Sequence, residues 1–337
     1  MDCERKSYGV SLVILQVQPK APDLVSVVIP TYNRAGLVGT AIQSALAQSH
    51  SPVEVLVVDD GSTDDTIAAL SRFSGVHVFR QENRGQGAAR QLGLEHASGA
   101  YIASLDSDDQ WKPEFLEESL RALRQTGAGF VFSNWSTLKA GGDLATEDAL
   151  SGLDYLAEEP YRDAGGWHLL SPKSTRRVFT RHCPAPSSSF LVDRRYISHG
   201  WSPEFRIADD WAFLLDIALR HEVGCAYTTR KLWNKGIDGT NICDRHRDAG
   251  ALAVKEIADL EQVLRSFGAL LTWRERKHIR GRIARGFGDL AYCQSIVSGT
   301  RRLALVSALR SLRAAQSVLG WKILAKCLIR SAAGARS

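Results

Sequence analysis

The chain has 337 residues, of which 44% are hydrophobic and 23% are charged, and its formal net charge is +5. This composition is typical of a soluble globular protein with a sizeable core, in one large or two modest domains. No run of about 20 apolar residues occurs, which excludes a helix that spans a bilayer. The six cysteines show no CxxC spacing, which favours free thiols in a cytosolic protein over disulfides or a zinc site.

Strand-like and helix-like segments alternate through the first 110 residues. The strands are apolar, β-branched runs, as expected for strands that are buried on both faces. The helices have apolar residues at helical spacing or begin with capping residue types. This order predicts a doubly wound, mostly parallel α/β layer, in which ligands bind at the carboxyl ends of the strands. We expect strands at 24–29, 53–58, 76–79 and 101–105, and helices at 36–47, from 62–65 onward and at 85–96.

The alternation fades after residue 111. Short strands are expected at 130–133 and 190–192. Residues 139–182 are mixed in composition and rich in turn-forming residues, which predicts a long surface excursion. Apolar residues at helical spacing predict further helices at 211–221 and 251–267, and two or three basic amphipathic helices within 273–332.

The acidic segment at the end of the fourth expected strand is the most informative feature of the chain. An apolar run ends at Asp106, and Asp108 and Asp109 follow it closely. Clustered carboxylates repel one another unless a cation or hydrogen-bond donors neutralise them. Hard divalent cations such as Mg²⁺ or Mn²⁺ take oxygen ligands and often bridge to substrate phosphates. We therefore predict a diphosphate–metal site at Asp106 and Asp108. The alternative is a solvated acidic turn that caps a helix starting near Pro113.

Polar motifs also follow the first and second strands and open the third helix. Pro30 ends the first strand, and Tyr32 just beyond it could stack on a planar base. Asp60, after the second strand, could form a hydrogen bond with a base or ribose. Glycines ahead of the third helix would let the backbone approach a ligand, with Arg84 or Arg90 contacting base or phosphate. Each motif also has a plain structural interpretation: turn packing for Tyr32, helix capping near Asp60 and a solvated helix position for Arg90.

A second acidic site lies at Asp209 and Asp210, directly before an apolar helical run. A carboxylate at a helix N-terminus is an ordinary capping choice, which accounts for one of the two. The other could serve as a general base, because a neighbouring carboxylate raises the pKa of a carboxyl group towards neutrality.

These motifs stand in a specific order along the chain. The segments PTYNR, VVDDGSTDDT, NRGQGAAR and LDSDD precede a downstream DDW. In this order and spacing the chain resembles the family-2 glycosyltransferases, which have the GT-A fold. The resemblance is close over residues 24–115. It continues more loosely through 186–195, where the family has a similar Ser-rich strand that contacts sugar or acceptor, and through 200–211, and it ends near residue 241.

The resemblance implies a role for each matching position. The nucleoside would be held by Pro30, Tyr32, Asp60 and Arg84. Asp106 would lie near the ribose and diphosphate, and Asp108 would ligate the divalent cation, Mg²⁺ or Mn²⁺. Asp210 would be the base that deprotonates the acceptor hydroxyl, with Asp209 supporting it.

The chain departs from the family pattern at three places. Gln91 stands where the family commonly has asparagine, and the acid pair is Asp-Asp rather than Glu-Asp. The downstream Tyr-Arg-x-His pattern is replaced by Trp-Asn-Lys-Gly at 233–236, so a histidine that could contact metal or diphosphate is missing. His246 and Lys235 are the candidate substitutes.

The resemblance also implies a catalytic domain and an activity, whereas the segments on either side of that domain are expected from the composition and pattern of the sequence. An N-terminal extension (1–22) would precede a GT-A catalytic domain (23–248), made of a nucleotide-binding half (23–115) and an acceptor half (116–248). A basic helical region (249–337) would follow. The expected activity is inverting transfer of a sugar from a nucleotide-sugar donor, most commonly a UDP-sugar, to an acceptor hydroxyl in glycan, polysaccharide or glycolipid biosynthesis.

Two other functions compete with this one. A sugar-phosphate nucleotidyltransferase needs a Gly-rich, Arg-bearing loop after the first strand to hold a triphosphate, and this chain has Pro-Thr-Tyr-Asn-Arg there. A non-catalytic nucleotide-sugar binding module is disfavoured because both acidic sites are present. Turnover of a donor distinguishes the binding module from the enzyme.

The C-terminal region has two interpretations. From Arg265 to the end, 15 Lys or Arg stand against two acidic residues, and apolar residues such as Leu303, Val306 and Leu309 recur at helical spacing. Such a stretch could lie on an anionic membrane surface, in keeping with a lipid-linked acceptor at the cytoplasmic face. It could equally be a helical lid packed on the catalytic domain. Nucleic-acid binding is disfavoured because no recognisable module is present.

Overall fold

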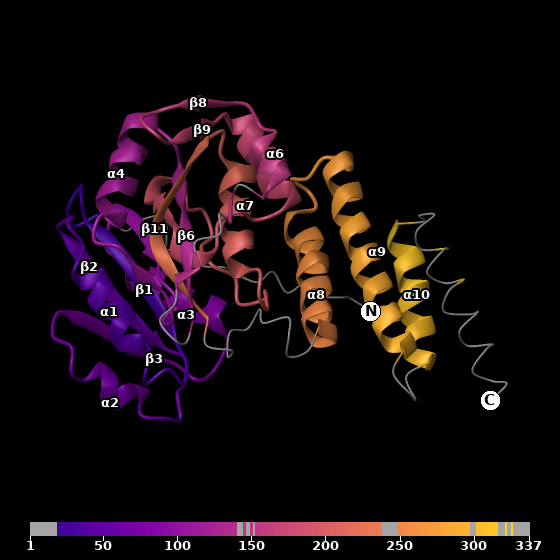
Figure 1. The fold of residues 1–337 in the computed structure, drawn as a ribbon, viewed down its shortest axis with the longest axis horizontal. Helices are drawn as coiled ribbons and strands as arrows, with labels where there is room; N and C mark the ends of the chain where they lie inside the picture. Colours follow the sequence, from indigo (N-terminus) through magenta and orange to yellow (C-terminus); the bar gives the residue numbers. More distant parts are fainter. Residues whose placement is uncertain are drawn as a thin grey trace, which may run out of the picture.

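The computed structural model describes residues 19–139, 144–145, 149–150, 152–237, 249–296 and 301–315, together with Trp321 and Ala325. One mixed β-sheet forms the centre of the molecule, and helices cover it (Figure 1). Its strand order is β3-β2-β1-β4-β10-β6-β11-β9-β8, with β5 paired to β11 and β7 paired to β6. Most of the expected N-terminal extension and the candidate substitute His246 lie outside the described residues.

The first part of the sheet is parallel, as predicted. β1 pairs in parallel with β2 and with β4, and β2 pairs in parallel with β3. A helix follows each of the first three strands. The elements are β1 (Val25–Thr31), α1 (Val38–Leu46), β2 (Val53–Asp59), α2 (Thr66–Leu70), β3 (Val76–Arg80), α3 (Gln86–His96) and β4 (Tyr101–Ser104).

The second part of the sheet mixes strand directions. β10 is antiparallel to both β4 and β6, whereas β6 and β11 are parallel. This part carries helices α4 and α7 and the short strands of the sheet edge. The elements are β5 (Gln110–Trp111), α4 (Phe115–Thr126), β6 (Phe130–Lys139), β7 (Leu144–Ala145), α5 (Asp154–Ala157), β8 (Tyr161–Asp163), β9 (His168–Leu170), α6 (Pro172–Arg181), β10 (Phe190–Asp193), α7 (Asp209–Arg220) and β11 (Cys225–Ile237).

The predicted surface excursion at 139–182 is wrong in its second half. That stretch contains the edge strands β8 and β9 and the ten-residue helix α6. α6 carries a recognisable start, because the Ser171 hydroxyl accepts a hydrogen bond from the N–H of Ser174 (3.1 Å) and Pro172 occupies the first helical position. Most residues of α6 are polar, so the apolar face formed by the buried Val178 and Phe179 is difficult to recognise in the sequence.

Two apolar clusters lie on opposite faces of the sheet. Successive residues of a strand contribute to different clusters: Phe130 and Phe132 belong to one and Val131 to the other. α1 and α4, with Leu70 of α2, supply the helical residues of the Val131 cluster. Residues of α3, α6 and α7 are among those of the Phe130 cluster, and this burial on both faces explains why the strands read as continuous apolar runs.

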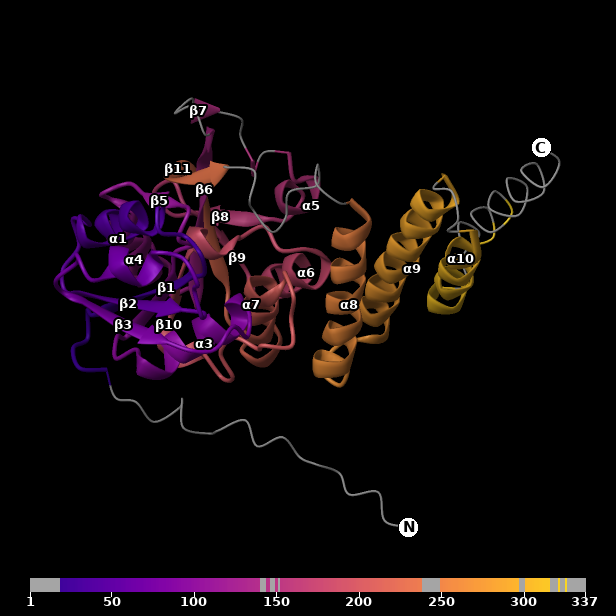
Figure 2. The ribbon, with the colours of Figure 1, turned by 90° about the horizontal axis from the view of Figure 1, so that it is seen from below.

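The C-terminal region is helical, as predicted, and forms a stack beside the sheet (Figures 1 and 2). Its helices are α8 (Ala249–Phe267), α9 (Trp273–Ile296) and α10 (Arg301–Ala315). Ile257 of α8 and Ile283 of α9 enter the same apolar cluster as α7, and α10 packs on α9. None of the described helices is both long and apolar enough to cross a membrane.

Candidate active site

The loops that follow β1 and β2 are tied together by hydrogen bonds. The N–H of Asn33 donates to Ser62 Oγ (2.9 Å), and Asn33 Oδ1 accepts from the N–H of Thr63 (2.8 Å). Asn33 has a φ of 52°, in the left-handed region that Asn tolerates better than most residues. The two strand ends therefore form one connected surface.

Pro30 lies inside β1 and not at its end, so the prediction that it stops the strand is wrong. It is buried and in register with Val58 of β2. β1 is in register with β4 only as far as Val28. The proline, which has no N–H to donate, therefore falls beyond the stretch that has neighbours on both sides. Tyr32 is 44% exposed just past the strand, where it is accessible to a ligand.

Asp60 is buried and holds the loop before α3. One carboxylate oxygen accepts from Gln81 Nε2 (2.7 Å) and from the N–H of Arg84 (2.8 Å), and the other accepts from the N–H of Gly85 (2.8 Å). The Arg84 side chain itself is exposed. Asp60 thus fixes the backbone that presents Arg84, a role that the sequence did not predict.

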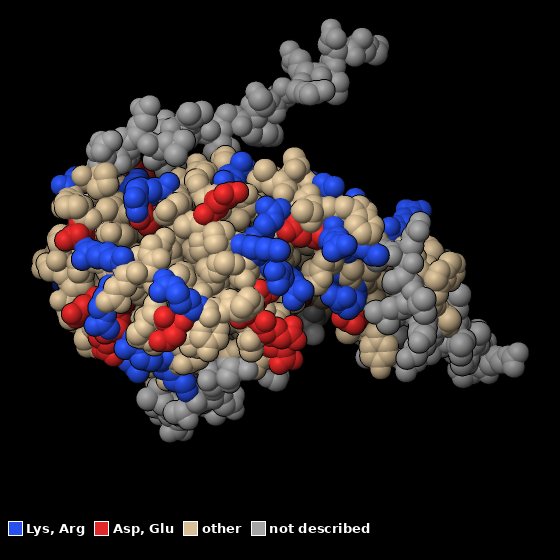
Figure 3. Space-filling view, turned by 90° about the horizontal axis from the view of Figure 1, so that it is seen from above, with Lys and Arg blue, Asp and Glu red and all other residues tan. Residues whose placement is uncertain are grey.

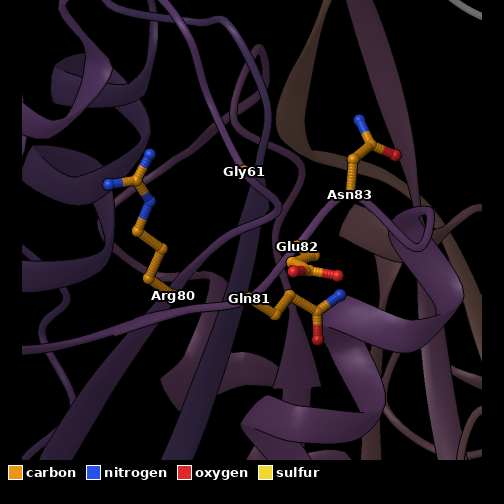
Figure 4. A pocket seen from close by; sticks show the side chains of 5 residues that line it. All are labelled: Gly61, Arg80, Gln81, Glu82 and Asn83. Carbon is orange, nitrogen blue, oxygen red and sulfur yellow. The ribbon is translucent and has the colours of Figure 1, made fainter.

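An open pocket of about 560 Å³ adjoins this loop. Figure 4 shows Arg80 and Asn83 on either side of Gly61. Arg80 Nε pairs with Asp59 (3.1 Å), and Arg80 Nη2 donates to the Ser62 carbonyl (3.0 Å), so the pocket wall is fixed. The pocket is lined by Gly61, Arg80, Gln81, Glu82 and Asn83.

The acidic segment after β4 gathers three carboxylates. One oxygen from each of Asp106, Asp108 and Asp109 lies within 4.8 Å of the others. Arg34 Nη2 lies 3.4 Å from Asp108 Oδ2, which connects the loop after β1 to this cluster. Asp106 and Asp108 therefore lie together, as the strand-end pattern predicted.

Asp109 differs from its two neighbours because both of its oxygens are engaged. Oδ2 accepts from Ser188 Oγ (2.6 Å), and Oδ1 accepts from the N–H of Gly236 (2.9 Å). Burial raises its pKa well above the usual range, and the charges of Asp106 and Asp108 add to this effect. Asp109 therefore connects the acidic turn to the Ser-rich segment and to the end of β11. A side chain at Gly236 would overlap the carbonyl of Asp108, so glycine is required there.

The donor set of this cluster fits a hard divalent cation. Carboxylate oxygens are the ligands that Mg²⁺ and Mn²⁺ prefer. Asp106 has 35% of its side chain exposed and Asp108 has 14%, whereas Asp109 is buried and committed to two hydrogen bonds. Asp106 and Asp108 are thus the residues that could hold the ion.

The acid pair opens helix α7, as the sequence predicted. Asp209 is fully buried, accepts a hydrogen bond from Gln86 Nε2 (2.6 Å) and forms an ion pair with Arg90. Asp210 is half-buried, and its Oδ1 accepts from the N–H of Trp211 (2.6 Å). Burial raises the pKa of Asp210 to about 7, with the charge of Asp209 adding to the rise and Arg90 opposing it. A carboxyl group with this pKa can act as a general base near neutrality.

Helix α8 fixes the turn that leads into the acid pair. The carboxylate of Asp259 accepts from the N–H groups of Arg206 (2.8 Å), Ile207 (2.9 Å) and Ala208 (2.9 Å). Three backbone donors on one carboxylate hold the chain in a single path immediately before Asp209. The sequence shows only that an aspartate lies on the apolar face of a predicted helix. No neighbouring residue in the chain indicates which groups form hydrogen bonds with it.

Arg90 connects the two acidic sites. It is 1% exposed, so its interpretation as a solvated helix residue is wrong. Nη2 contacts Asp106 Oδ1 (2.6 Å), Nη1 contacts Asp209, and Nε donates to Ser104 Oγ (3.1 Å). Burial opposes its charge, but Asp209 and Asp106 outweigh burial and raise the pKa of Arg90. The guanidinium thus holds the carboxylate beyond β4 and the carboxylate that opens α7 close to each other.

Of the two candidate substitutes for the missing family histidine, only Lys235 lies among the described residues. Lys235 on β11 lies close enough to Asp109 to lower its pKa, against the larger effect of burial. Gln91, the other departure, donates from Nε2 to Glu95 (3.1 Å), while its Oε1 is buried without a hydrogen-bond partner among the described residues.

Replacing Gly87 with Ala is expected to lower activity by about 10²-fold, the cost of a misplacement near 1 Å. A Cβ at this position of α3 would lie 2.8 Å from the Ser202 carbonyl and 3.2 Å from Asp209 Cβ, so the segment carrying the acid pair must shift. Steady-state kinetics measure the loss. Gly281→Ala is the matched control, because its Cβ would meet only Arg285 Nη1 at 3.9 Å and alanine favours a helix. Equal activity of Gly87→Ala and wild type would contradict the packing argument.

Comparison with known proteins gives one matching family model and several similar proteins. The model described as Glycosyl transferase family 2 matches residues 26–180. TuaG of Bacillus subtilis, assigned to teichuronic acid biosynthesis as a glycosyltransferase, is 38% identical over 124 residues, which are 35% of this chain and 49% of TuaG. WfgD of Escherichia coli, a UDP-Glc:alpha-D-GlcNAc-diphosphoundecaprenol beta-1,3-glucosyltransferase, is 34% identical over 118 residues, which are 34% of this chain and 47% of WfgD. The matches thus span about half the length of these relatives.

Solved structures match a larger share of the chain at lower identity. TarS of S. aureus, solved as residues 1–349 in complex with UDP-GlcNAc, has a TM-score of 0.53 and 16% identity, covering 92% of each chain. The mannosyltransferase PcManGT of Pyrobaculum calidifontis, solved with GDP-Man and Mn²⁺, has a TM-score of 0.52 and 17% identity, covering 95% of this chain and 88% of that one. At these identities the likeness concerns the fold, and it extends over the C-terminal helices.

Proposed function

Residues 26–180 belong to glycosyl transferase family 2 and the chain has the GT-A fold, and on that premise we propose that the protein is an inverting glycosyltransferase. It would move a sugar from a nucleotide-sugar donor to an acceptor hydroxyl. The observation that carries this proposal is the bridge through Arg90, which holds the carboxylate beyond β4 and the acid pair of α7 together. A donor diphosphate and an acceptor base need this proximity, because the reacting atoms must approach to within about 3–3.5 Å.

The donor would bind across the connected strand ends. The Tyr32 ring is exposed for stacking, Asp60 presents the loop that carries Arg84, and the exposed Arg84 guanidinium can reach a base or phosphate. Asp106 would face the ribose and diphosphate. Pro30 would shape the floor of the nucleoside site. A UDP-sugar is the favoured donor, in line with the donor in the name of WfgD.

Asp108, with Asp106, would hold Mg²⁺ or Mn²⁺. When bound, such an ion would offset the negative charge that develops on the departing nucleoside diphosphate. Lys235 would add positive charge from β11, in place of the family histidine. Asp109 would position the acidic turn through Ser188 and Gly236 and would not ligate.

Asp210 would remove the proton from the acceptor hydroxyl. Asp209 is held by Arg90 and Gln86, so it fixes the start of α7 and keeps a negative charge beside Asp210, which helps to raise the pKa of the base. The acceptor oxygen would attack the anomeric carbon from the face opposite the diphosphate. A single displacement of this kind inverts the anomeric configuration.

The acceptor would belong to a glycan, a polysaccharide or a lipid-linked sugar. The name of TuaG points to teichuronic acid biosynthesis, and the name of WfgD gives a lipid diphosphate acceptor. A sugar-phosphate nucleotidyltransferase is a poorer fit, because a Pro-Thr-Tyr-Asn-Arg loop and not a glycine-rich one follows β1.

A screen of purified protein against nucleotide sugars, with released nucleoside diphosphate as the readout, tests the proposal. We expect release from one donor class, most favourably UDP-sugars, and faster release when acceptor is added. Binding of a nucleotide sugar without release under any acceptor would instead indicate a binding module.

The outward face of α10 is expected to bind anionic membranes. Leu303, Val306 and Leu309 are 55%, 48% and 50% exposed, whereas Ala304 and Ala308 are buried. Arg310 and Arg313 on the same helix are exposed, and Lys and Arg side chains gather over α6 and α9 on the face shown in Figure 3. Apolar and basic groups together favour a membrane surface, with each nearby cation contributing about 1 kcal/mol.

Co-sedimentation with vesicles that contain phosphatidylserine measures this binding. We expect binding that weakens with salt and falls in the double variant Leu303→Ser, Leu309→Ser. The matched control is Val254→Ser, another half-exposed apolar position, on α8. No binding at low salt would leave α10 as a surface for some other contact.

A further inference from the structure

Five basic side chains from two helices meet beside the start of α7. Arg181 and His182 lie at the end of α6, and His278, Arg282 and Arg285 lie on α9. The His182 and His278 rings are 6.4 Å apart, and Arg282 Nη1 donates to the Arg181 carbonyl (2.7 Å). Partial burial, together with the charges of Arg282, His278, Arg285 and Arg181, lowers the pKa of His182 to about 4. We call these five residues the α6–α9 basic cluster.

The cluster lies next to the proposed base. The Arg282 guanidinium stands over the Trp211 ring, 5.0 Å from its centre, and Trp211 directly follows Asp210. Cys183, adjacent to His182, lies near both Asp210 and Arg282. Burial and then Asp210 raise the pKa of its thiol, and Arg282 lowers it. The basic cluster and Asp210 therefore flank the same short segment at the end of α6.

The positive charge of the cluster is not balanced by close carboxylates. Among the described residues, no Asp or Glu oxygen lies within 4.0 Å of the guanidinium of Arg181, Arg282 or Arg285. Glu256 on α8 is near enough to favour the charged form of Arg282. Burial and the charge of Arg285 have the larger effect, however, and lower the pKa of Arg282 overall. The Nε2 atom of His278 is buried and has no hydrogen-bond partner among the described residues. Guanidinium groups that repel one another in this way are costly unless an anion binds among them.

We propose that the α6–α9 basic cluster binds a phosphate or diphosphate group that belongs to the acceptor, and so places the acceptor hydroxyl at Asp210. This inference rests on the proposed function, which supplies the base. The donor diphosphate has its own site at Asp106 and Asp108, on the β4 side of Arg90. Guanidinium groups suit phosphate oxygens because they can donate two parallel hydrogen bonds.

Calorimetric titration of the full chain with pyrophosphate, in EDTA, tests the site without any need for turnover. EDTA prevents a metal ion from recruiting pyrophosphate to the acidic cluster. The variants are Arg282→Gln and the exposed Arg285→Gln, which removes a charge without disturbing packing. The control is Arg280→Gln. Arg280 is an exposed residue of α9 two positions before Arg282, and so lies on a different side of the helix.

We expect each cluster variant to weaken pyrophosphate binding by about tenfold or more, as for a lost hydrogen bond to a charged group, and Arg280→Gln to have no effect. Excess UDP should not displace the pyrophosphate. Absence of binding, equal binding by all variants, or displacement by UDP would each overturn the proposal.

Kinetics then identify the source of the phosphate. Arg285→Gln should raise KM about tenfold for a glycan acceptor that carries a diphosphate, and leave KM unchanged for the same glycan without it. If pyrophosphate binding depends on the cluster but this KM does not change, the site serves free phosphate and its assignment to the acceptor falls. If no sugar is transferred while pyrophosphate binding still depends on Arg282 and Arg285, the proposed function fails and the anion site stands.

Discussion

Replacing Asp210 with Asn is expected to lower kcat by about 10²- to 10⁴-fold, the usual contribution of a general base. Asparagine has nearly the same shape, so α7 should keep its start and the Arg90–Asp209 ion pair should remain. Because the base acts on the acceptor, donor affinity should be retained. Steady-state kinetics and calorimetry with the donor measure the two quantities separately.

The pH dependence of the reaction gives a second view of the same residue. A base must be deprotonated to act, and the pKa of Asp210 is raised to about 7. The value of kcat/KM should therefore rise as pH increases through about 7 and then level off. This limb should disappear in Asp210→Asn and persist in Glu222→Gln, an exposed carboxylate just beyond α7. An equal loss of donor affinity in Asp210→Asn would make Asp210 a donor ligand or a structural cap.

Replacing Asp108 with Asn is expected to reduce activity by about 100-fold or more, because the ion supplies several kcal/mol of transition-state stabilisation. Removal of divalent cations with EDTA should have a comparable effect on the wild-type protein, reversed by Mg²⁺ or Mn²⁺. Asp65→Asn is the matched control, since Asp65 is exposed at the same sheet edge and lies outside the carboxylate cluster.

Thermal unfolding separates this effect from a loss of fold. Asp108→Asn should unfold near the wild-type temperature and lose the shift that Mn²⁺ produces in the wild-type protein. Full activity in excess EDTA would show that the reaction needs no divalent cation, but it would leave the role of Asp210 as the base unchanged.

The strand ends were predictable because their signals are local. β1, β2 and β4 read as buried apolar runs, and each ends in polar residues. In a parallel sheet such ends meet at one edge, so the sequence alone predicts that Asp60 and the Asp106 to Asp109 segment lie at the same edge.

Residues that act across the chain were not predictable in the same way. β11 interrupts its apolar residues with Thr-Thr-Arg-Lys, and its register shifts there relative to β6, so no regular alternation marks it as a strand. The partners of Arg90 at Asp209 and of Asp109 at Ser188 are 119 and 79 residues away. Only the closed fold brings these groups together, because the sequence specifies which side chains are charged but not which distant group neutralises them.

The anomeric configuration of the product is the most direct test of the proposed mechanism. In that mechanism Asp210 activates the acceptor for one displacement of the nucleoside diphosphate held at the end of β4. Proton NMR of the product, recorded as it forms from an α-linked nucleotide sugar, resolves the coupling at the anomeric proton. We expect a β-linked product from the first turnover. An α-linked product would contradict the proposed mechanism, because retention requires two displacements or a different attacking face.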